Sequence, residues 1–353
     1  MPRGPEPVAG PGRIRMRDVA AAVGVSVKTV SEALNGTGQV RDRTRERVLA
    51  AAAELGYRPD PVARGLNAAR TGMICLALPR LGYGYCAPLA AAVFDAARGM
   101  GLSVVLEPTD GDPVRERAAV DGDTRIADGV LLVPHAVTGR ELAATVPVTP
   151  AVAMGPRRVD GPFDRIHSAD EQAGETATRA LLDRGCTRIV LLGGSSGESA
   201  GARGAGTDAG AAGLRSRGYR RALVSGGLPV VPELVVGDGA RQAGDGRAAV
   251  AALLAAGVRF DGLLALEEPL AHGALHALRT AGTAVPDAVR VVAFGTGSLA
   301  GYATPSITTV EPDVSAMAGR ALALLAGRIG GYAGPWRTER TGYTVVHRES
   351  TGA

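Results

Sequence analysis

Near the start of the chain, apolar residues recur at helical spacing in three successive blocks. Within each block the apolar positions repeat about every three to four residues, which is the pattern of an amphipathic helix. We expect an all-α domain over residues 13–57, preceded by a disordered tail over residues 1–12 that is rich in proline and glycine. The predicted apolar faces are Val19, Ala20 and Val23 in the first helix, Val30, Ala33 and Leu34 in the second, and Val48, Leu49, Ala52 and Leu55 in the third.

From residue 72 onward, short apolar runs alternate with alanine-rich helical patterns. This alternation predicts βαβ units that build parallel sheets with helices on both faces. The segments are too numerous for one sheet, so we expect residues 72–353 to form two doubly wound α/β lobes. Small ligands bind in clefts between such lobes. The predicted strands are 73–79, 102–106, 129–134, 147–154, 188–192, 262–266 and 289–294, and the predicted helices are 87–100, 171–184, 248–256, 271–281 and 314–328.

The first two predicted helices and the turn between them have the features of a helix-turn-helix. Gly24 permits a tight turn, and Ser26 is a suitable N-cap for the second helix. The polar face of the second helix carries Val27, Lys28, Ser31 and Glu32. In a helix-turn-helix, residues near the start of the second helix meet base edges in the major groove. A plain three-helix bundle remains the alternative.

Positive charge is concentrated in the same region. Residues 1–71 hold twelve basic and seven acidic side chains, whereas the whole chain has a net charge of only +4. Clustered positive charge is the electrostatic signature of a nucleic-acid partner. The three cysteines have no CxxC spacing, so neither a disulfide framework nor a zinc site is predicted. No apolar run approaches the roughly 18 residues that span a membrane. We therefore expect a cytoplasmic protein without a cofactor.

The order and spacing of several motifs closely resemble the lactose-repressor (LacI/GalR) family of bacterial transcription regulators. These motifs are Asp18-Val19-Ala20, Val25-Ser26, Thr29-Val30-Ser31, Leu34-Asn35-Gly36, Leu55-Gly56-Tyr57-Arg58-Pro59, Asp128-Gly129-Val130 and Thr304-Pro305-Ser306-Ile307-Thr308-Thr309. The resemblance implies a repressor that binds double-stranded, pseudo-palindromic operator DNA as a homodimer. It also implies a periplasmic-binding-protein-like core that binds a small, sugar-like effector.

For DNA recognition, the resemblance places base-reading roles at Val27 and Lys28. The matching anchoring positions are Arg17, Ser26, Thr29, Ser31 and Asn35. Glu32 departs from the family, which usually has arginine there, and the acid predicts an altered base preference because a carboxylate accepts from cytosine N4. Residues 58–71 resemble the family's hinge helix, in which Ala63, Arg64 and Leu66 are candidate DNA contacts and Leu66 matches the leucine that wedges into the minor groove. A plain interdomain linker is the alternative.

For effector recognition, the resemblance favours Arg215, with Tyr85, Asp170, Glu267 and Glu268 at matching pocket positions. An arginine on a helix surface is the alternative interpretation of Arg215. Gly295 stands where the family usually has an aspartate that binds sugar hydroxyls. The sugar-binding set is therefore incomplete, which predicts either an atypical effector or weakened ligand control.

Other function classes find less support in the sequence. A sugar-binding module without a regulatory role is the main alternative, but the intact helix-turn-helix argues against it. The glycine-rich run 193–210 lacks the lysine-serine context of a phosphate-binding loop and is predicted to be a flexible insertion. His272 and His276 have metal-ligand spacing without an evident third ligand, so a solvated helix face is the preferred interpretation. No catalytic motif of an enzyme is present.

Overall fold

The computed structural model describes residues 14–35, 38–57, 70–82, 84–121, 126–144, 147–157, 159–194, 210–297 and 299–352. It divides into a first unit, Met1–Thr71, and a second unit, Gly72–Ala353. The two units are described separately below. Among the described helices, none combines the length and the apolar composition needed to cross a lipid bilayer.

The first unit consists of helices α1 (Met16–Val23), α2 (Val27–Asn35) and α3 (Asp42–Glu54), which pack around an aliphatic core. That core contains Val19, Ala20, Val23, Val30, Ala33, Val48 and Ala52, which confirms the predicted faces of the first two helices. The predicted face of the third helix was partly wrong. Leu49 and Leu55 are 47% and 37% exposed, because so small a unit covers only a narrow stripe of α3.

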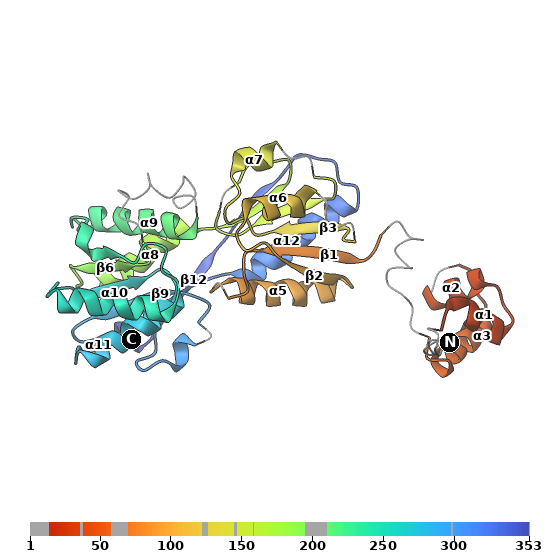
Figure 1. Ribbon diagram of the computed structural model, residues 1–353, viewed down its shortest axis with the longest axis horizontal. Helices are drawn as coiled ribbons and strands as arrows, with labels where there is room; N and C mark the ends of the chain where they lie inside the picture. Colours follow the sequence, from red (N-terminus) through yellow and green to blue (C-terminus); the bar gives the residue numbers. More distant parts are fainter. Residues whose placement is uncertain are drawn as a thin grey trace, which may run out of the picture. The chain divides into compact units, whose positions relative to one another are not determined.

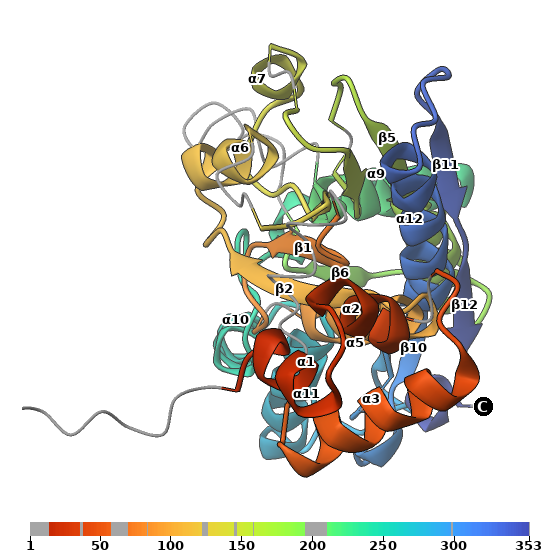
Figure 2. The ribbon, with the colours of Figure 1, turned by 90° about the vertical axis from the view of Figure 1, so that its right-hand side faces the viewer.

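The second unit contains two six-stranded sheets, each covered by helices on both faces (Figures 1 and 2). Lobe 1 has the strand order β11-β5-β4-β3-β1-β2, and every pairing in it is parallel. Its strands are β1 (Met73–Leu78), β2 (Ser103–Pro108), β3 (Gly129–Leu132), β4 (Ala151–Met154), β5 (Asp164–Ser168) and β11 (Thr338–Thr341). Its helices are α5 (Cys86–Gly99), α6 (Pro113–Asp121), α7 (Gly139–Ala143) and α12 (Val314–Ile329).

Lobe 2 has the strand order β12-β10-β9-β8-β6-β7, in which only the β10–β12 pairing is antiparallel. Its strands are β6 (Ile189–Leu192), β7 (Val235–Val236), β8 (Gly262–Ala265), β9 (Arg290–Phe294), β10 (Thr308–Pro312) and β12 (Tyr343–Val346). Its helices are α8 (Asp170–Leu182), α9 (Ala211–Ser225), α10 (Ala243–Ala255) and α11 (Glu268–Thr280), with the short 3-10 segments 232–234, 300–302 and 349–351.

Apolar clusters on the two faces of each sheet explain this layering. In lobe 1, α5 and α12 cover one face through residues such as Leu89, Val93 and Leu322, and α6 and α7 cover the other. In lobe 2, α10 and α11 cover one face, and α8 and α9 cover the other. The chain passes between the lobes three times, at Ala169, Asp313 and Gly342. The prediction of two doubly wound lobes is confirmed.

The predicted elements match the structure apart from their ends and several omissions. The predicted strand 147–154 begins only at Ala151, since Pro147 and Pro150 cannot donate backbone hydrogen bonds to a sheet. Helix α11 begins at Glu268, whereas the sequence predicted its start at residue 271. Strands β5 and β11 and helix α6 escaped prediction, because their sequences are too polar to show an apolar run. Strands β7, β10 and β12 and helices α7 and α9 were also not predicted.

Candidate functional site

The turn between α1 and α2 has the local chemistry that the sequence predicts. Gly24 adopts the left-handed conformation with φ of 73°, which a residue with a Cβ atom rarely takes. The Oγ atom of Ser26 accepts a hydrogen bond of 3.0 Å from the backbone N–H of Thr29, which caps the start of α2. At the other end of the turn, Arg47 of α3 donates to the carbonyl of Val23 at 2.9 Å. The start of α2 is therefore held firmly.

The exposed face of α2 presents the two residues to which the family resemblance assigns base reading. Val27 is 47% exposed although it is aliphatic, and the side chain of Lys28 is 85% exposed. Val30 and Ala33 on the opposite face are buried against α1 and α3. A buried back and an exposed, partly apolar front suit a helix that enters a groove of DNA.

Glu32 lies one turn after Lys28 and is less exposed, at 31% of its side chain. Its carboxylate is 3.9 Å from the ammonium group of Lys28, so the two side chains form an i,i+4 ion pair. A Cβ atom on Gly38 would lie 2.7 Å from Cδ of Glu32, which shows that Glu32 leans against the segment that follows α2. Glu32 thus borders the exposed face of α2 and pairs with Lys28.

The other residues predicted to contact DNA lie partly within and partly outside the described part of the structure. Arg17 is exposed and lies 3.7 Å from Asp18. Thr29 and Ser31 are half-buried on α2. The backbone of Asn35 ends α2, whereas its side chain lies outside the described part of the structure. Ala63, Arg64 and Leu66 of the predicted hinge helix also lie outside the described residues.

In the second unit, the residues predicted to bind an effector come together where α8 and α9 cross. The two helices touch backbone to backbone, because a Cβ atom on Gly174 or Gly218 would collide with main-chain atoms of the opposing helix. This close contact lets Arg215 of α9 reach the carboxylate of Asp170, at the start of α8, across 2.7 Å. The Arg215 and Asp170 side chains are only 8% and 3% exposed.

Arg215 is thus not an arginine on a helix surface. Besides Asp170, it donates to the carbonyl of Leu266 at 2.7 Å. Its guanidinium carbon lies 4.1 Å from the centroid of the Phe294 ring, so the cation also stacks on an aromatic face. The carbonyl of Leu266 and the ring of Phe294 come from the carboxyl ends of β8 and β9, where doubly wound sheets bind ligands. Sequence reasoning missed both contacts, although the position at strand ends was the available signal.

Tyr85 of lobe 1 and Glu267 of lobe 2 complete this cluster. Burial raises the pKa of Tyr85, and the nearby carboxylates of Asp170 and Glu267 add to the rise. Burial also raises the pKa of Glu267, while Arg215 and Arg241 oppose the rise. A Cβ atom on Gly84 would lie 2.8 Å from Oε2 of Glu267, so the two lobes meet closely here.

Arg241 is a further member of the cluster that sequence reasoning missed. Its guanidinium lies 3.4 Å from the carboxylate of Glu267, whose side chain is 18% exposed. Arg241 follows β7, at the same carboxyl edge of the sheet as Leu266 and Phe294. That position at a strand end was the signal that could have found it.

Glu268 has a different role from the one expected of it. Its carboxylate accepts from the backbone N–H groups of Gly297, Leu299 and Ala300 at 2.9–3.2 Å. Burial alone would raise the pKa of Glu268, but His272 and these backbone groups hold it below its usual value. Both carboxylate oxygens are engaged in fixing a loop, so the geometry removes Glu268 from the candidate effector set.

The same side chain explains the departure at Gly295. A Cβ atom at that position would lie 2.6 Å from Cβ of Glu268 and would also collide with its carboxylate. Real Cβ atoms do not approach other atoms so closely, so any larger residue requires the chain to shift. Gly295 therefore accommodates Glu268, and the sugar-binding aspartate of the family has no room in this arrangement.

Thiol and histidine side chains add no reactive centre within the described residues. All three cysteines are free and buried, and burial raises the pKa of Cys86 to about 11. His272 lies 3.7 Å from Glu268, and His276 lies 3.4 Å from Arg279. Among the residues that the structure describes, no three histidine, cysteine or acidic side chains gather into a metal site.

Comparisons with known proteins agree with both units. Residues 15–60 match the model for bacterial regulatory proteins of the lacI family, and residues 178–351 match the periplasmic binding protein-like domain. The chain is 31% identical to the ribose operon repressor of Halalkalibacterium halodurans over 300 residues, which cover 85% of each protein. It is also 31% identical to the transcriptional regulator GalS of Salmonella typhimurium over 307 residues, which cover 86% of this chain and 87% of that protein.

Solved structures show the same architecture. A LacI-family transcriptional regulator from Sanguibacter keddieii shares 36% identity and a TM-score of 0.71, with 80% of this chain and 100% of that chain covered. The lac repressor dimer bound to operator has a TM-score of 0.82 over 97% of this chain and 100% of its own, at 23% identity, which supports the fold. These relatives are transcription regulators rather than enzymes. The chain therefore belongs to the lacI family of bacterial regulatory proteins and is a DNA-binding transcription regulator.

Proposed function

We propose that this regulator is a cytoplasmic repressor that binds a pseudo-palindromic operator as a homodimer and responds to a small, sugar-like effector. In this proposal residues 13–57 form the DNA-binding domain, residues 58–71 the hinge helix and residues 72–353 the effector-binding and dimerisation core. The observation that carries the proposal is the exposed face of α2. Val27 and Lys28 lie on this face, while the opposite face of α2 packs into the buried core of the three helices.

Lys28 is the proposed reader of a guanine, because an ammonium group donates well to O6 and N7 in the major groove. Val27 suits contact with a thymine methyl group. Ser26 is proposed to act mainly through the helix, since its Oγ already accepts from the backbone of Thr29. Arg17, Thr29, Ser31 and Asn35 are proposed phosphate or backbone anchors, which fix position without reading sequence.

Operator selection tests the DNA half of the proposal. Full-length protein is used to enrich binding sites from random duplexes, and affinity for the enriched site is then measured as a function of salt. We expect a symmetric site and an affinity that falls steeply with salt, because phosphate contacts release counterions. Glu32→Arg should change the preferred base at one position of each half-site. Recovery of an asymmetric or random pool would contradict the proposal, and identical sites for both proteins would remove the role of Glu32.

The proposed effector contacts are Arg215, Asp170, Tyr85 and Glu267, with Arg241 beside them. A buried charged pair stacked on Phe294 provides the polar and aromatic groups that sugar sites use. Two relatives are named ribose operon repressors, and one similar solved structure is a complex of a transcriptional regulator with cellobiose.

A thermal-shift screen tests the effector half of the proposal. Ribose, galactose and cellobiose are suitable first probes, because a ligand that binds only the folded protein raises its melting temperature. We expect one class of sugar to stabilise the wild type and not Tyr85→Ala. If no sugar stabilises the core, the replacement of the family's aspartate by Gly295 favours repression without a ligand.

A further inference from the structure

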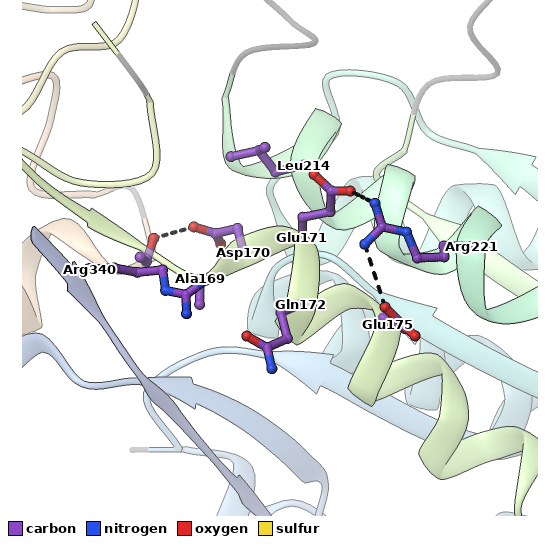
Figure 3. A pocket seen from close by; sticks show the side chains of 9 residues that line it. Ala169, Asp170, Glu171, Gln172, Glu175, Leu214, Arg221 and Arg340 are labelled. Atoms are coloured by element: carbon purple, nitrogen blue, oxygen red, sulfur yellow. Dashed lines mark hydrogen bonds and ion pairs between the residues drawn. The ribbon is translucent and has the colours of Figure 1, made fainter. Parts of the chain in front are cut away.

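A second cavity, separate from the proposed effector site, lies where the chain crosses between the lobes. Its volume is about 470 Å³, within the range of roughly 300–1,000 Å³ typical of small-molecule sites. Figure 3 shows its wall at the start of α8, beside β11 and α9. The wall shares Asp170 with the effector site but does not include Arg215, Tyr85 or Glu267. The lining residues are Ser168, Ala169, Asp170, Glu171, Gln172, Glu175, Leu214, Arg221 and Arg340.

Both lobes contribute to this hinge cavity. Ser168 ends β5 and Arg340 lies on β11, and these neighbouring strands belong to lobe 1. Gln172 and Glu175 come from α8 and Leu214 from α9, which belong to lobe 2. The chain crosses between the lobes at Ala169, which lines the cavity, and at Gly342, two residues after the lining residue Arg340. A molecule in the cavity would therefore contact both lobes beside these crossings.

Most of the charged groups around the cavity are already paired. Asp170 pairs with buried Arg215. The carboxylate of Glu171 contacts Arg221, and that of Glu175 lies 2.7 Å from Arg179. These carboxylates are therefore not available to recognise a ligand without first giving up an internal partner.

Two recognition groups in the wall remain available. Among the residues that the structure describes, neither the guanidinium of Arg340 nor the side-chain amide of Gln172 has a hydrogen-bond or ion-pair partner. In Figure 3 the Arg340 side chain extends from β11 toward the start of α8, where Gln172 lies. Arg340 is exposed on β11, while its neighbour Glu339 pairs with Arg320 at 3.8 Å.

The lining itself holds two arginines, 221 and 340, and three carboxylates, but each carboxylate is paired with at least one arginine. Together with the pairing arginines 179, 215 and 217, which lie outside the lining, five arginines offset the three carboxylates of Asp170, Glu171 and Glu175, and Arg340 supplies the unpaired positive charge. A planar guanidinium binds the two oxygens of a carboxylate or phosphate with parallel hydrogen bonds. A side-chain amide adds a further N–H donor.

We propose that the hinge cavity is a second ligand site, which binds a small organic anion through a carboxylate or phosphate group held by Arg340 and Gln172. This site is distinct from the one proposed for the sugar-like effector at the Arg215 cluster, although both include Asp170.

Calorimetric titration of the full-length protein tests this proposal, with citrate and inorganic phosphate as probes at constant ionic strength in chloride buffer. We expect saturable binding of at least one probe, weakened tenfold or more by Arg340→Gln and by Gln172→Glu. Arg98→Gln is the control, because Arg98 is another exposed arginine of lobe 1, 80% accessible, and does not line the cavity. Melting curves in chloride establish that each variant is folded.

The two probes also distinguish the source of the anion. Binding of citrate alone indicates a carboxylate ligand, and binding of phosphate alone indicates a phosphate ester. The proposal is overturned if neither probe binds saturably, or if the Arg340 and Gln172 variants bind as the wild type does. It is also overturned if Arg215→Met abolishes anion binding while Arg340→Gln leaves it intact, since the anion then occupies the effector cluster.

Discussion

Replacing Arg215 by methionine should destabilise the second unit strongly, because it leaves the buried carboxylate of Asp170 without its positively charged partner. Asp170 is 3% exposed, and its charge is matched by an arginine only 2.7 Å away. Removing one partner of such a buried pair costs about 3–5 kcal/mol. Replacing both partners, as Asp170→Asn with Arg215→Met, should cost less than Arg215→Met alone, because no unpaired charge then remains buried.

Urea unfolding of the full-length protein, followed by far-ultraviolet circular dichroism, measures these free energies. Arg221→Met is the control: it removes an arginine from the same helix, but its side chain is 57% exposed. An exposed ion pair contributes about 0–1 kcal/mol, so this variant should unfold nearly as the wild type does. If the effects of Asp170→Asn and Arg215→Met simply add to within about 0.5 kcal/mol, the two groups are not coupled and the reasoning fails.

Three further predictions concern the other sites. Lys28→Ala should reduce discrimination at one operator base by about 1–3 kcal/mol in competition gel shifts, and an unchanged preference would exclude it as a reader. Gly295→Asp should lower stability by about 1–3 kcal/mol in urea, since its side chain collides with Glu268, and should not create sugar binding. Burial alone would raise the pKa of Asp164, but Arg328 and other donors hold it below 3.8. The stability that this pair contributes is therefore present above pH 3.8 and lost as pH falls further, so the difference in unfolding free energy between wild type and Asp164→Asn should shrink in acid.

The apolar pattern of the sequence was sufficient to predict most of the fold. Helical spacing identified α1 and α2, and Gly24 and Ser26 identified the turn between them, since turn and cap chemistry is local. Prediction failed for strands such as β5 and β11, whose polar residues serve contacts distant in the chain. Asp164 of β5, for example, is buried against Arg328, which lies 164 residues later.

The candidate sites show the same contrast between local features, which the sequence predicts, and contacts between distant residues, which it does not. The sequence by itself determined the exposed face of α2, because exposure on a short amphipathic helix follows from the spacing of its buried residues. It also singled out Arg215, but not what surrounds it. Only the tertiary structure decided that Arg215 is buried against Asp170 and Phe294, that Glu268 fixes a loop, and that Gly295 must be small. These contacts join residues far apart in sequence, and their energies depend on distances and burial that arise only when the helices and strands have packed.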